Sequence, residues 1–243
     1  MKNKKVKLES VGILINKEKN WAKKLKQQLT SYLLKNKVKI LSPSKAQILI
    51  TVGGDGTLLY YKNKYLKPYF AIGTKKSWLV QATNINYKKY LKKIIRDGFR
   101  IEKRIMIRAE INGKRILDCL NELAIRNKEH RIVEFELKIK KRKYKFYADG
   151  VIFSTPTGST AYAYSCGGKE LKPTEERYEV VAIAPYRRKF KPLILKKDVK
   201  CFLYVKTTCK TDALIDGQIE IELKNNTKIE VQVSENRFEF VKA

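Results

Sequence analysis

A short β-branched segment that ends in glycines and an aspartate constrains the fold of this chain more than any other feature. Residues 48–52 read Ile-Leu-Ile-Thr-Val, and Gly53-Gly54-Asp55-Gly56-Thr57 follow directly. The run is short and rich in β-branched residues, which favours a buried strand over a helix. Glycine takes positive φ at little cost, so the turn can expose backbone N–H groups, and Thr57 can open a helix. This arrangement is typical of phosphate binding. A plain Asp-Gly turn after a core strand is the alternative.

The first hundred residues alternate expected strands with expected helices. The apolar patterns predict strands at 11–15, 38–41, 46–52 and 69–72, and helices at about 20–36, 58–64 and 87–95. Such alternation is typical of a mainly parallel sheet, on which ligands bind beyond the carboxyl ends of the strands. We therefore expect an α/β domain over residues 1–98, with the glycine turn at its ligand-binding edge.

From about residue 99 onward, apolar and charged residues alternate with a period of two, which predicts strands. The segments are 101–111, 115–126, 131–140, 143–147, 178–184, 199–206, 213–215, 219–223 and 229–233. Asn112-Gly113 predicts a tight hairpin turn. We expect a second, β-rich domain over residues 99–233, and we expect residues 234–243 to pack back on the first domain.

A second polar segment runs from Asp149 to Gly168. An expected strand at 151–153 leads into Ser-Thr-Pro-Thr-Gly-Ser-Thr and then a short Ala/Tyr stretch. Hydroxyls and free N–H groups at a helix start suit ribose hydroxyls or phosphates, and Tyr162 can offer its ring to a purine. A capped helix after a tight turn is the structural alternative.

Two shorter polar pieces interrupt expected strands. Asn121 and Glu122 would point to opposite faces of one strand, so one of them would face the core or a cleft and would need partners. Asp216-Gly217-Gln218 fits either a binding site or a simple hairpin turn.

The formal net charge of +30 attracts polyanions in general. Lysines are spread along the chain, with local runs only at 2–7 and 138–145, and a small anionic substrate would gain from the same field. We therefore expect no specific nucleic-acid partner, although a basic nucleic-acid-binding protein remains the non-enzyme alternative.

The cysteines show neither CxxC pairing nor metal-ligand spacing, and the chain has one histidine, His130. This argues against structural zinc and against Ser-His or Cys-His nucleophilic catalysis. Because the cysteines are scattered and neither a signal peptide nor an apolar stretch of about 20 residues occurs, we expect a cytoplasmic protein without a membrane partner. The four cysteines are Cys119, Cys166, Cys201 and Cys209.

Four segments resemble motifs of the NAD kinase family and occur in the same order as in that family: 53–57, 121–122, 149–168 and 216–218. The first also resembles diacylglycerol kinases, sphingosine kinases and phosphofructokinases, whereas the third is far more specific. The resemblance implies an α/β domain and a β-rich domain with the active site between them. It implies phosphorylation of the 2′-hydroxyl of the adenosine ribose of NAD, with ATP or polyphosphate as donor and a divalent metal such as Mg²⁺ or Mn²⁺. It also implies a homodimer or homotetramer.

Residue roles follow from the same resemblance. Asp55 would be the catalytic contact to the acceptor hydroxyl and the candidate metal ligand. Donor phosphate would be held by Gly53, Gly54, Gly56 and Thr57. NAD would be held by Asp55, Gly56, Asn121, Glu122, Asp149, Thr157, Thr160, Ala161, Tyr162, Ser165 and Asp216.

The chain also departs from the family pattern. After the strand at 69–72 the family usually has Gly-x-Asn-x-Gly-x-x-Gly-Phe, but here Gly73 precedes Thr-Lys-Lys-Ser-Trp-Leu-Val. Trp78 is a candidate replacement for the aromatic residue. Tyr147 stands where a basic residue is common, and Pro185-Tyr186 lacks the usual histidine.

A lipid kinase of the diacylglycerol type is the rival enzyme, because it shares the glycine–aspartate turn. It would not require Asn121-Glu122 or the hydroxyl-rich loop. The absence of GxGxxG and GxxxxGK[ST] disfavours a nucleotide-binding dehydrogenase and a P-loop NTPase.

Phosphoryl transfer depends mostly on alignment and charge neutralisation. A carboxylate with a pKa of about 4 cannot deprotonate a ribose hydroxyl before attack. Asp55 would therefore orient the hydroxyl and accept its proton late, while Lys75 or Lys76 neutralises phosphate charge.

Overall fold

The computed structural model describes residues 5–129 and 131–243, so His130 and the start of the 2–7 lysine run lie outside the described residues. The chain forms two compact units. The N-terminal unit extends to Lys103 and includes Phe238–Ala243, and the C-terminal unit comprises Arg104–Arg237. The chain passes between the units within two strands, β6 (Arg100–Ile111) and β17 (Thr227–Lys242).

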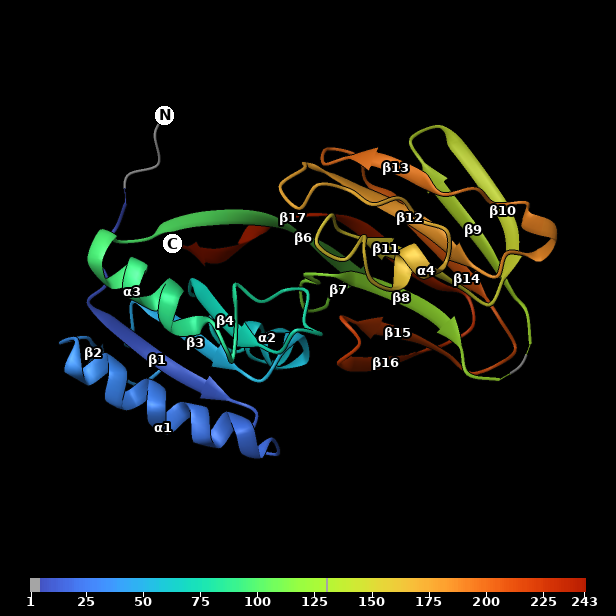
Figure 1. Ribbon diagram of the computed structural model, residues 1–243. Coiled ribbons are helices and arrows are strands. Elements are labelled where there is room, and N and C mark those ends of the chain that lie inside the picture. The colour runs from blue at the N-terminus through green and yellow to red at the C-terminus, as the bar shows by residue number, and fades with distance from the viewer. Residues whose placement is uncertain (1–4, 130) are drawn as a thin grey trace. The chain divides into compact units, whose positions relative to one another are not determined.

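A parallel sheet forms the centre of the N-terminal unit (Figure 1), in the order β2-β1-β3-β4. β5 runs parallel to β4, and Phe240 of β17 also pairs with Tyr69 of β4. This is the mainly parallel α/β sheet that the alternating sequence pattern predicts. The strands are β1 (Ser10–Ile15), β2 (Lys39–Ile40), β3 (Ile48–Val52), β4 (Tyr69–Gly73) and β5 (Ala82–Thr83).

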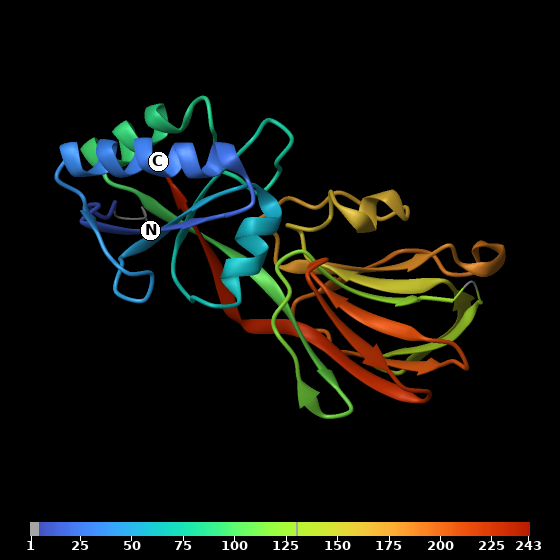
Figure 2. The ribbon, with the colours of Figure 1, turned by 90° about the horizontal axis from the view of Figure 1, so that it is seen from below.

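Helices cover both faces of this sheet (Figure 2). α1 (Asn20–Lys35) and α3 (Tyr87–Asp97) pack on one face, where the apolar stripe of α1 meets alternate residues of β3. α2 (Asp55–Lys62) lies on the other face, where the Tyr69 hydroxyl donates to the carbonyl oxygen of Tyr61 at 2.9 Å. The predicted start of this helix near residue 58 was too late, because Leu58 N–H already donates to the carbonyl of Gly54 at 3.3 Å.

Two antiparallel sheets form the C-terminal unit, with a continuous apolar core built from both of them. One has the order β10-β9-β14-β17, with β6 beside β17, and the other has the order β13-β12-β11-β8-β15-β16. The expected β-rich architecture is therefore present. The bounds of these strands, and of β7 beside β6, are β7 (Lys114–Arg115), β8 (Glu122–Asn127), β9 (Val133–Ile139), β10 (Arg142–Ala148), β11 (Gly150–Ser154), β12 (Arg177–Ile183), β13 (Leu193–Lys196), β14 (Cys201–Lys206), β15 (Thr211–Ile215) and β16 (Ile219–Leu223).

Local turn chemistry explains some of these elements. Asn112 and Gly113 both have positive φ, 49° and 81°, and they join β6 to β7 as the hairpin pattern predicts. The expected single strand at 115–126 was wrong, because regular pairing ends after β7, an isolated bridge joins Cys119 to Ile107 of β6, and β8 begins at Glu122 in the other sheet. Asn121 therefore precedes the strand, and the argument that Asn121 and Glu122 occupy opposite faces of it does not hold.

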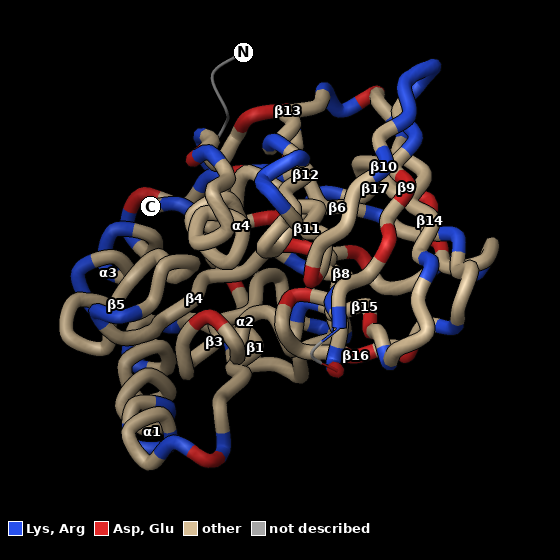
Figure 3. Tube along the Cα trace, turned by 90° about the vertical axis from the view of Figure 1, so that its right-hand side faces the viewer, with Lys and Arg blue, Asp and Glu red and all other residues tan. Residues whose placement is uncertain are grey.

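Lysines and arginines occur on strands, helices and loops along the whole described chain, as Figure 3 shows for the Cα trace. Within the described residues, no helix is both long enough and apolar enough to span a membrane. All four cysteines are free thiols.

Candidate active site

The glycine turn lies at the point where the strand order of the parallel sheet reverses. β2 lies on one side of β1, and β3 lies on the other side. Backbone hydrogen bonds tie this edge together: Asn16 N–H donates to the carbonyl of Val52 at 2.9 Å, and Gly53 N–H donates to that of Ile72 at 3.1 Å. Ligands of open α/β sheets bind at such a reversal, outside the carboxyl ends of the strands.

Asp55 is the first residue of α2, and the loop after β4 holds its carboxylate. Trp78 N–H donates to Oδ2 at 2.8 Å, and Leu79 N–H donates to Oδ1 at 3.0 Å. Each carboxylate oxygen keeps acceptor capacity for a further donor. The segment that departs from the family pattern therefore fixes Asp55 through its backbone, while the Trp78 side chain is 80% exposed.

Steric crowding explains why glycine occupies positions 53 and 73. A Cβ on Gly53 would collide with Oγ1 of Thr57, and a Cβ on Gly73 would approach Oγ of Ser77 to 2.5 Å. Gly54 has φ 102° and is the N-cap of α2, which a residue with a side chain rarely tolerates. Thr57 Oγ1 is buried and has no hydrogen-bond partner in the described residues, so the turn contains an unused polar atom.

Lys19 also contacts the glycine turn, and it was not among the candidate site residues predicted from the sequence. Its Nζ donates to the carbonyl oxygen of Gly53 at 2.9 Å, from the N-cap position of α1. No ion pair of Lys19 occurs in the described part of the chain. In contrast, no hydrogen bond joins the side chains of Lys75 or Lys76 to the turn within the same residues. The sequence feature that could have identified Lys19 is its position shortly after β1, because the carboxyl end of β1 adjoins that of β3.

A second group of predicted site residues lies in the C-terminal unit, where Asp216 holds the segment before β8. Asp216 Oδ1 accepts from Asn121 N–H at 2.7 Å and from Glu122 N–H at 3.2 Å, and Oδ2 accepts from Leu120 N–H at 3.0 Å. Asp216 also has φ 49°, as a residue of the turn after β15. It is therefore both a turn residue and the anchor of Asn121 and Glu122.

The hydroxyl-rich loop packs directly on this anchored segment. Thr155 Oγ1 donates to the carbonyl of Leu120 at 2.5 Å, and it accepts from the N–H groups of Thr157 and Gly158 at 3.1 and 3.2 Å. A Cβ on Gly158 would collide with the backbone of Asn121. Thr155 was not predicted as a site residue, yet it organises the loop.

Three side-chain atoms of this group are buried without a hydrogen-bond partner in the described residues: Asn121 Oδ1, Glu122 Oε2 and Thr157 Oγ1. Buried polar atoms are nearly always paired, so such atoms need an explanation, and a ligand supplies one. Burial, together with the nearby charge of Asp216, raises the pKa of Glu122 to about 8. The Glu122 carboxyl is therefore mostly protonated at neutral pH and can donate a hydrogen bond.

The remaining predicted residues surround α4 (Tyr162–Ser165). This short helix packs through Ala163 on one face of the second sheet. Burial is the main cause that raises the pKa of Tyr162, and electrostatic interactions with Cys166, Asp149 and Glu122 add to it. Thr160, Ala161, Tyr162, Ser165 and Asp149 are exposed and accessible to a ligand.

Asp55 is the candidate metal ligand at the glycine turn. In the described residues, no three His, Cys, Asp or Glu side chains form a cluster that could hold one. Mg²⁺ is commonly bound through one or two carboxylates together with substrate phosphates. Asp55 beside the glycine turn fits that donor set, so the residues suit a metal that arrives with a phosphate donor.

Comparison with known proteins decides the family. Residues 120–243 match the ATP-NAD kinase C-terminal domain. An NAD kinase of Fusobacterium nucleatum is 30% identical over 95% of this chain and 91% of its own length. The chain belongs to the NAD kinase family. An NAD kinase of Thermoplasma volcanium is 29% identical over 84% of this chain and 76% of its own length.

Solved NAD kinase structures share the fold. A yeast NADH kinase complexed with NADH has a TM-score of 0.86 at 19% identity, covering 98% of this chain and 84% of its own. An Archaeoglobus fulgidus NAD kinase in complex with ATP has a TM-score of 0.82 at 24% identity, covering 95% and 92%. These likenesses support the two-domain NAD kinase architecture that the sequence motifs imply.

Proposed function

We propose that this NAD kinase transfers a phosphoryl group from ATP or polyphosphate to the 2′-hydroxyl of the adenosine ribose of NAD, giving NADP. The observation that carries the proposal is a set of unpartnered buried polar atoms at motif positions. These atoms belong to Thr57 in the N-terminal unit and to Asn121, Glu122 and Thr157 in the C-terminal unit. The related structures with bound NADH and bound ATP support the two substrate classes.

In the proposed reaction, Asp55 orients the acceptor hydroxyl. The hydroxyl oxygen forms a bond to the transferred phosphorus while the bond to the leaving phosphate breaks, and the hydroxyl proton passes late to the carboxylate. The two N–H groups of residues 78 and 79 hold the carboxylate in place for this role. A divalent metal would neutralise phosphate charge, and Asp55 is the side chain that would contact it.

Donor phosphate is assigned to the glycine turn. Gly53, Gly54 and Gly56 carry no side chain that would screen the backbone of the turn, and the Thr57 hydroxyl has no hydrogen-bond partner in the described residues, so it is available as a donor. Lys19 adds a positive charge at the same turn. We therefore assign the neutralisation of phosphate charge to Lys19 and no longer to Lys75 or Lys76.

The C-terminal unit is assigned to NAD. Asn121 and Glu122 hold ribose hydroxyls, and Asp216 positions both of them through their backbone. The residues assigned to the adenine end are Asp149, Thr157, Thr160, Ala161, Tyr162 and Ser165. We also propose that this unit forms the contacts of a homodimer or homotetramer, and that the protein works in the cytoplasm, where its four thiols stay reduced.

A coupled assay tests the proposal. Purified protein is incubated with NAD, Mg²⁺ and either ATP or polyphosphate, and NADP is read out by an NADP-specific dehydrogenase. We expect NADP with at least one donor, and none when NAD is omitted. Absence of NADP with every donor would overturn the proposal, and ATP-dependent phosphorylation of diacylglycerol would favour the lipid-kinase alternative.

A further inference from the structure

A groove outside the residues assigned to NAD opens at one edge of the C-terminal unit. It has a volume of about 700 Å³ and is lined by the β9–β10 hairpin, by β13 and by Val199. β10 and β13 are the terminal strands of their sheets, and no hydrogen-bonded pairing joins the two in the described part of the chain. The interior between the sheets is therefore accessible at this edge, where a closed barrel would have hidden it.

The floor of the groove is aliphatic. Ile139 and Val199 belong to the apolar core, and Leu193, Leu195 and Tyr144 pack against it as partly buried side chains. Tyr144 is the one uncharged hydrogen-bonding side chain among the lining residues. The floor therefore suits a flexible apolar chain better than a purine, which would need polar groups that read its edges.

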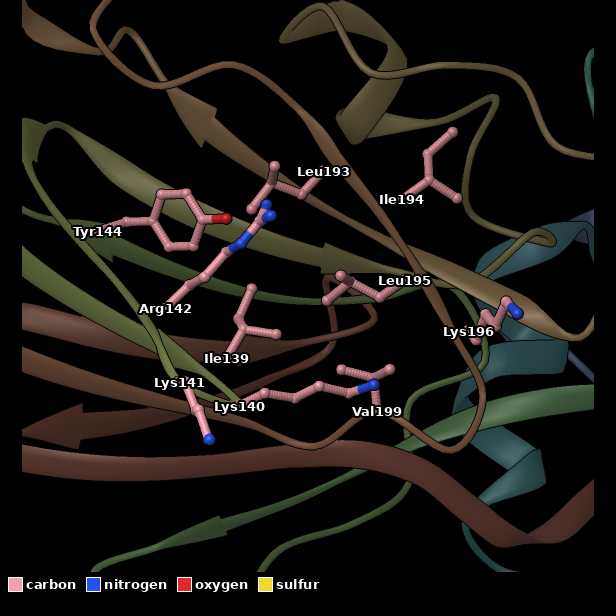
Figure 4. Close-up of a pocket in the computed structure, with 10 residues that line it drawn as sticks. All are labelled: Ile139, Lys140, Lys141, Arg142, Tyr144, Leu193, Ile194, Leu195, Lys196 and Val199. Carbon is pink, nitrogen blue, oxygen red and sulfur yellow. The ribbon is translucent and has the colours of Figure 1, made fainter.

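The rim of the groove is basic. Lys140, Lys141, Arg142 and Lys196 line it, and no acidic side chain does so. In Figure 4, Arg142 extends toward Leu193 and Lys140 extends toward Val199, whereas Lys141 points away from the apolar side chains.

In the part of the chain that the structure describes, the rim cations lack the ion pairs that nearby lysines of the β9–β10 hairpin form. Lys143 and Lys138 pair with Glu136 at 2.9 and 3.4 Å. Within residues 5–129 and 131–243, no ion pair involves Lys140, Arg142 or Lys196. Edge-strand lysines also discourage pairing with other chains, and a two-fold contact through this face would bring like charges together. The charges therefore favour an anion over a second copy of this chain.

We propose that this groove binds an amphipathic anion of the fatty-acyl type, with its chain on the aliphatic floor and its anionic head group at Arg142 and Lys140. The apolar floor supplies burial of methylene groups, and the two cations supply charge complementarity. The assignment is independent of the NAD kinase reaction, because none of the groove residues belongs to the proposed active site.

Calorimetric titration of the full chain with decanoate below its micelle concentration tests this proposal. We expect saturable one-to-one binding that is about tenfold or more tighter than that of hexanoate, because four more methylene groups are buried. Decyltrimethylammonium, which has an alkyl chain of similar length and the opposite charge, should not compete with decanoate for the groove. Linear, non-saturable heat for decanoate would overturn the proposal.

Two charge-reversal pairs separate the groove from the general basic field. The double variant Lys140→Glu, Arg142→Glu should weaken decanoate binding about tenfold or more, since it inverts the rim charge. Lys92→Glu, Lys93→Glu changes the net charge equally on the exposed face of α3 and should alter binding less than about twofold. Equal weakening by both variants would contradict the groove assignment.

Two further measurements guard against misfolding and against a membrane origin of the signal. In the unmutated protein, decanoate should shift the backbone NMR signals of residues 139–144 and 193–199, and shifts confined to other residues would contradict the proposal. Phosphatidylglycerol vesicles test the lipid-surface alternative. Vesicle binding that the groove variant abolishes, without any decanoate binding, would replace the free anion with a membrane surface.

Discussion

The backbone N–H of Asn121 donates a 2.7 Å hydrogen bond to Oδ1 of Asp216. The two residues lie 95 positions apart in the chain, so the bond fixes the start of β8 against the turn after β15. Asp216 thereby acts on the proposed NAD site through the backbone of Asn121 and Glu122. It is a positioning residue.

Asp216→Asn tests this role. Asn tolerates the left-handed conformation at this position but retains only one carbonyl-type acceptor, so one or more of the backbone bonds should be lost. We expect the free energy of unfolding to fall by about 1–3 kcal/mol and KM for NAD to rise more than kcat falls. Urea unfolding and steady-state kinetics measure both. Asp198→Asn, at an exposed turn position, is the control and should change neither.

Glu122 makes the stability of the ligand-free protein depend on pH. Its pKa is raised from 4.5 to about 8, so between these values the folded chain holds a proton that the unfolded chain has lost. The contribution of this group to stability is therefore fully present below about pH 4.5 and is lost as pH rises toward 8. The total loss should be on the order of a few kcal/mol.

Urea unfolding across pH 5 to 9 checks this expectation. Glu122→Gln should remove most of the decline, because its neutral amide does not titrate. Glu220→Gln is the matched control, since nearby Lys128 lowers the pKa of Glu220 and so gives the opposite sign. An unchanged decline in Glu122→Gln would show that another group causes it.

Much of the candidate site could be predicted from the sequence because its signals are local. A β-branched strand followed by Gly53–Thr57 specifies a turn in which Gly53 is needed for steric reasons and Gly54 for its positive φ. The Thr/Ser/Gly loop likewise follows a buried strand and begins a short helix. In both cases adjacent residues carry enough information to predict the element and its polar character.

Other features depend on contacts that are distant in sequence. Lys19 reaches Gly53 only because β1 and β3 are neighbours in the sheet. Thr155 gains its role from the Leu120 carbonyl, 35 positions away. The β13 strand was missed because Leu-Ile-Leu lacks the period-two alternation of a half-buried strand.

Lys19→Met removes the charge beside the glycine turn while retaining an unbranched side chain. If Lys19 neutralises donor phosphate, KM for ATP should rise about tenfold, which corresponds to about 1.4 kcal/mol. KM for NAD should stay within about twofold. Lys23→Met, one turn further along α1 and exposed, should behave like the unmutated enzyme. An equal rise of both KM values in Lys19→Met would point to a general structural effect.

The central claim is that Asp55 presents the acceptor hydroxyl, and Asp55→Asn tests it most directly. The amide keeps the size of the side chain and one acceptor for the N–H groups of Trp78 and Leu79, but it is neutral and cannot take the hydroxyl proton. NAD affinity is measured by calorimetry, and turnover is measured by NADP formation. We predict that NAD affinity is retained within a few fold and that kcat falls by about 10² or more. Near-normal turnover in this variant would contradict the account.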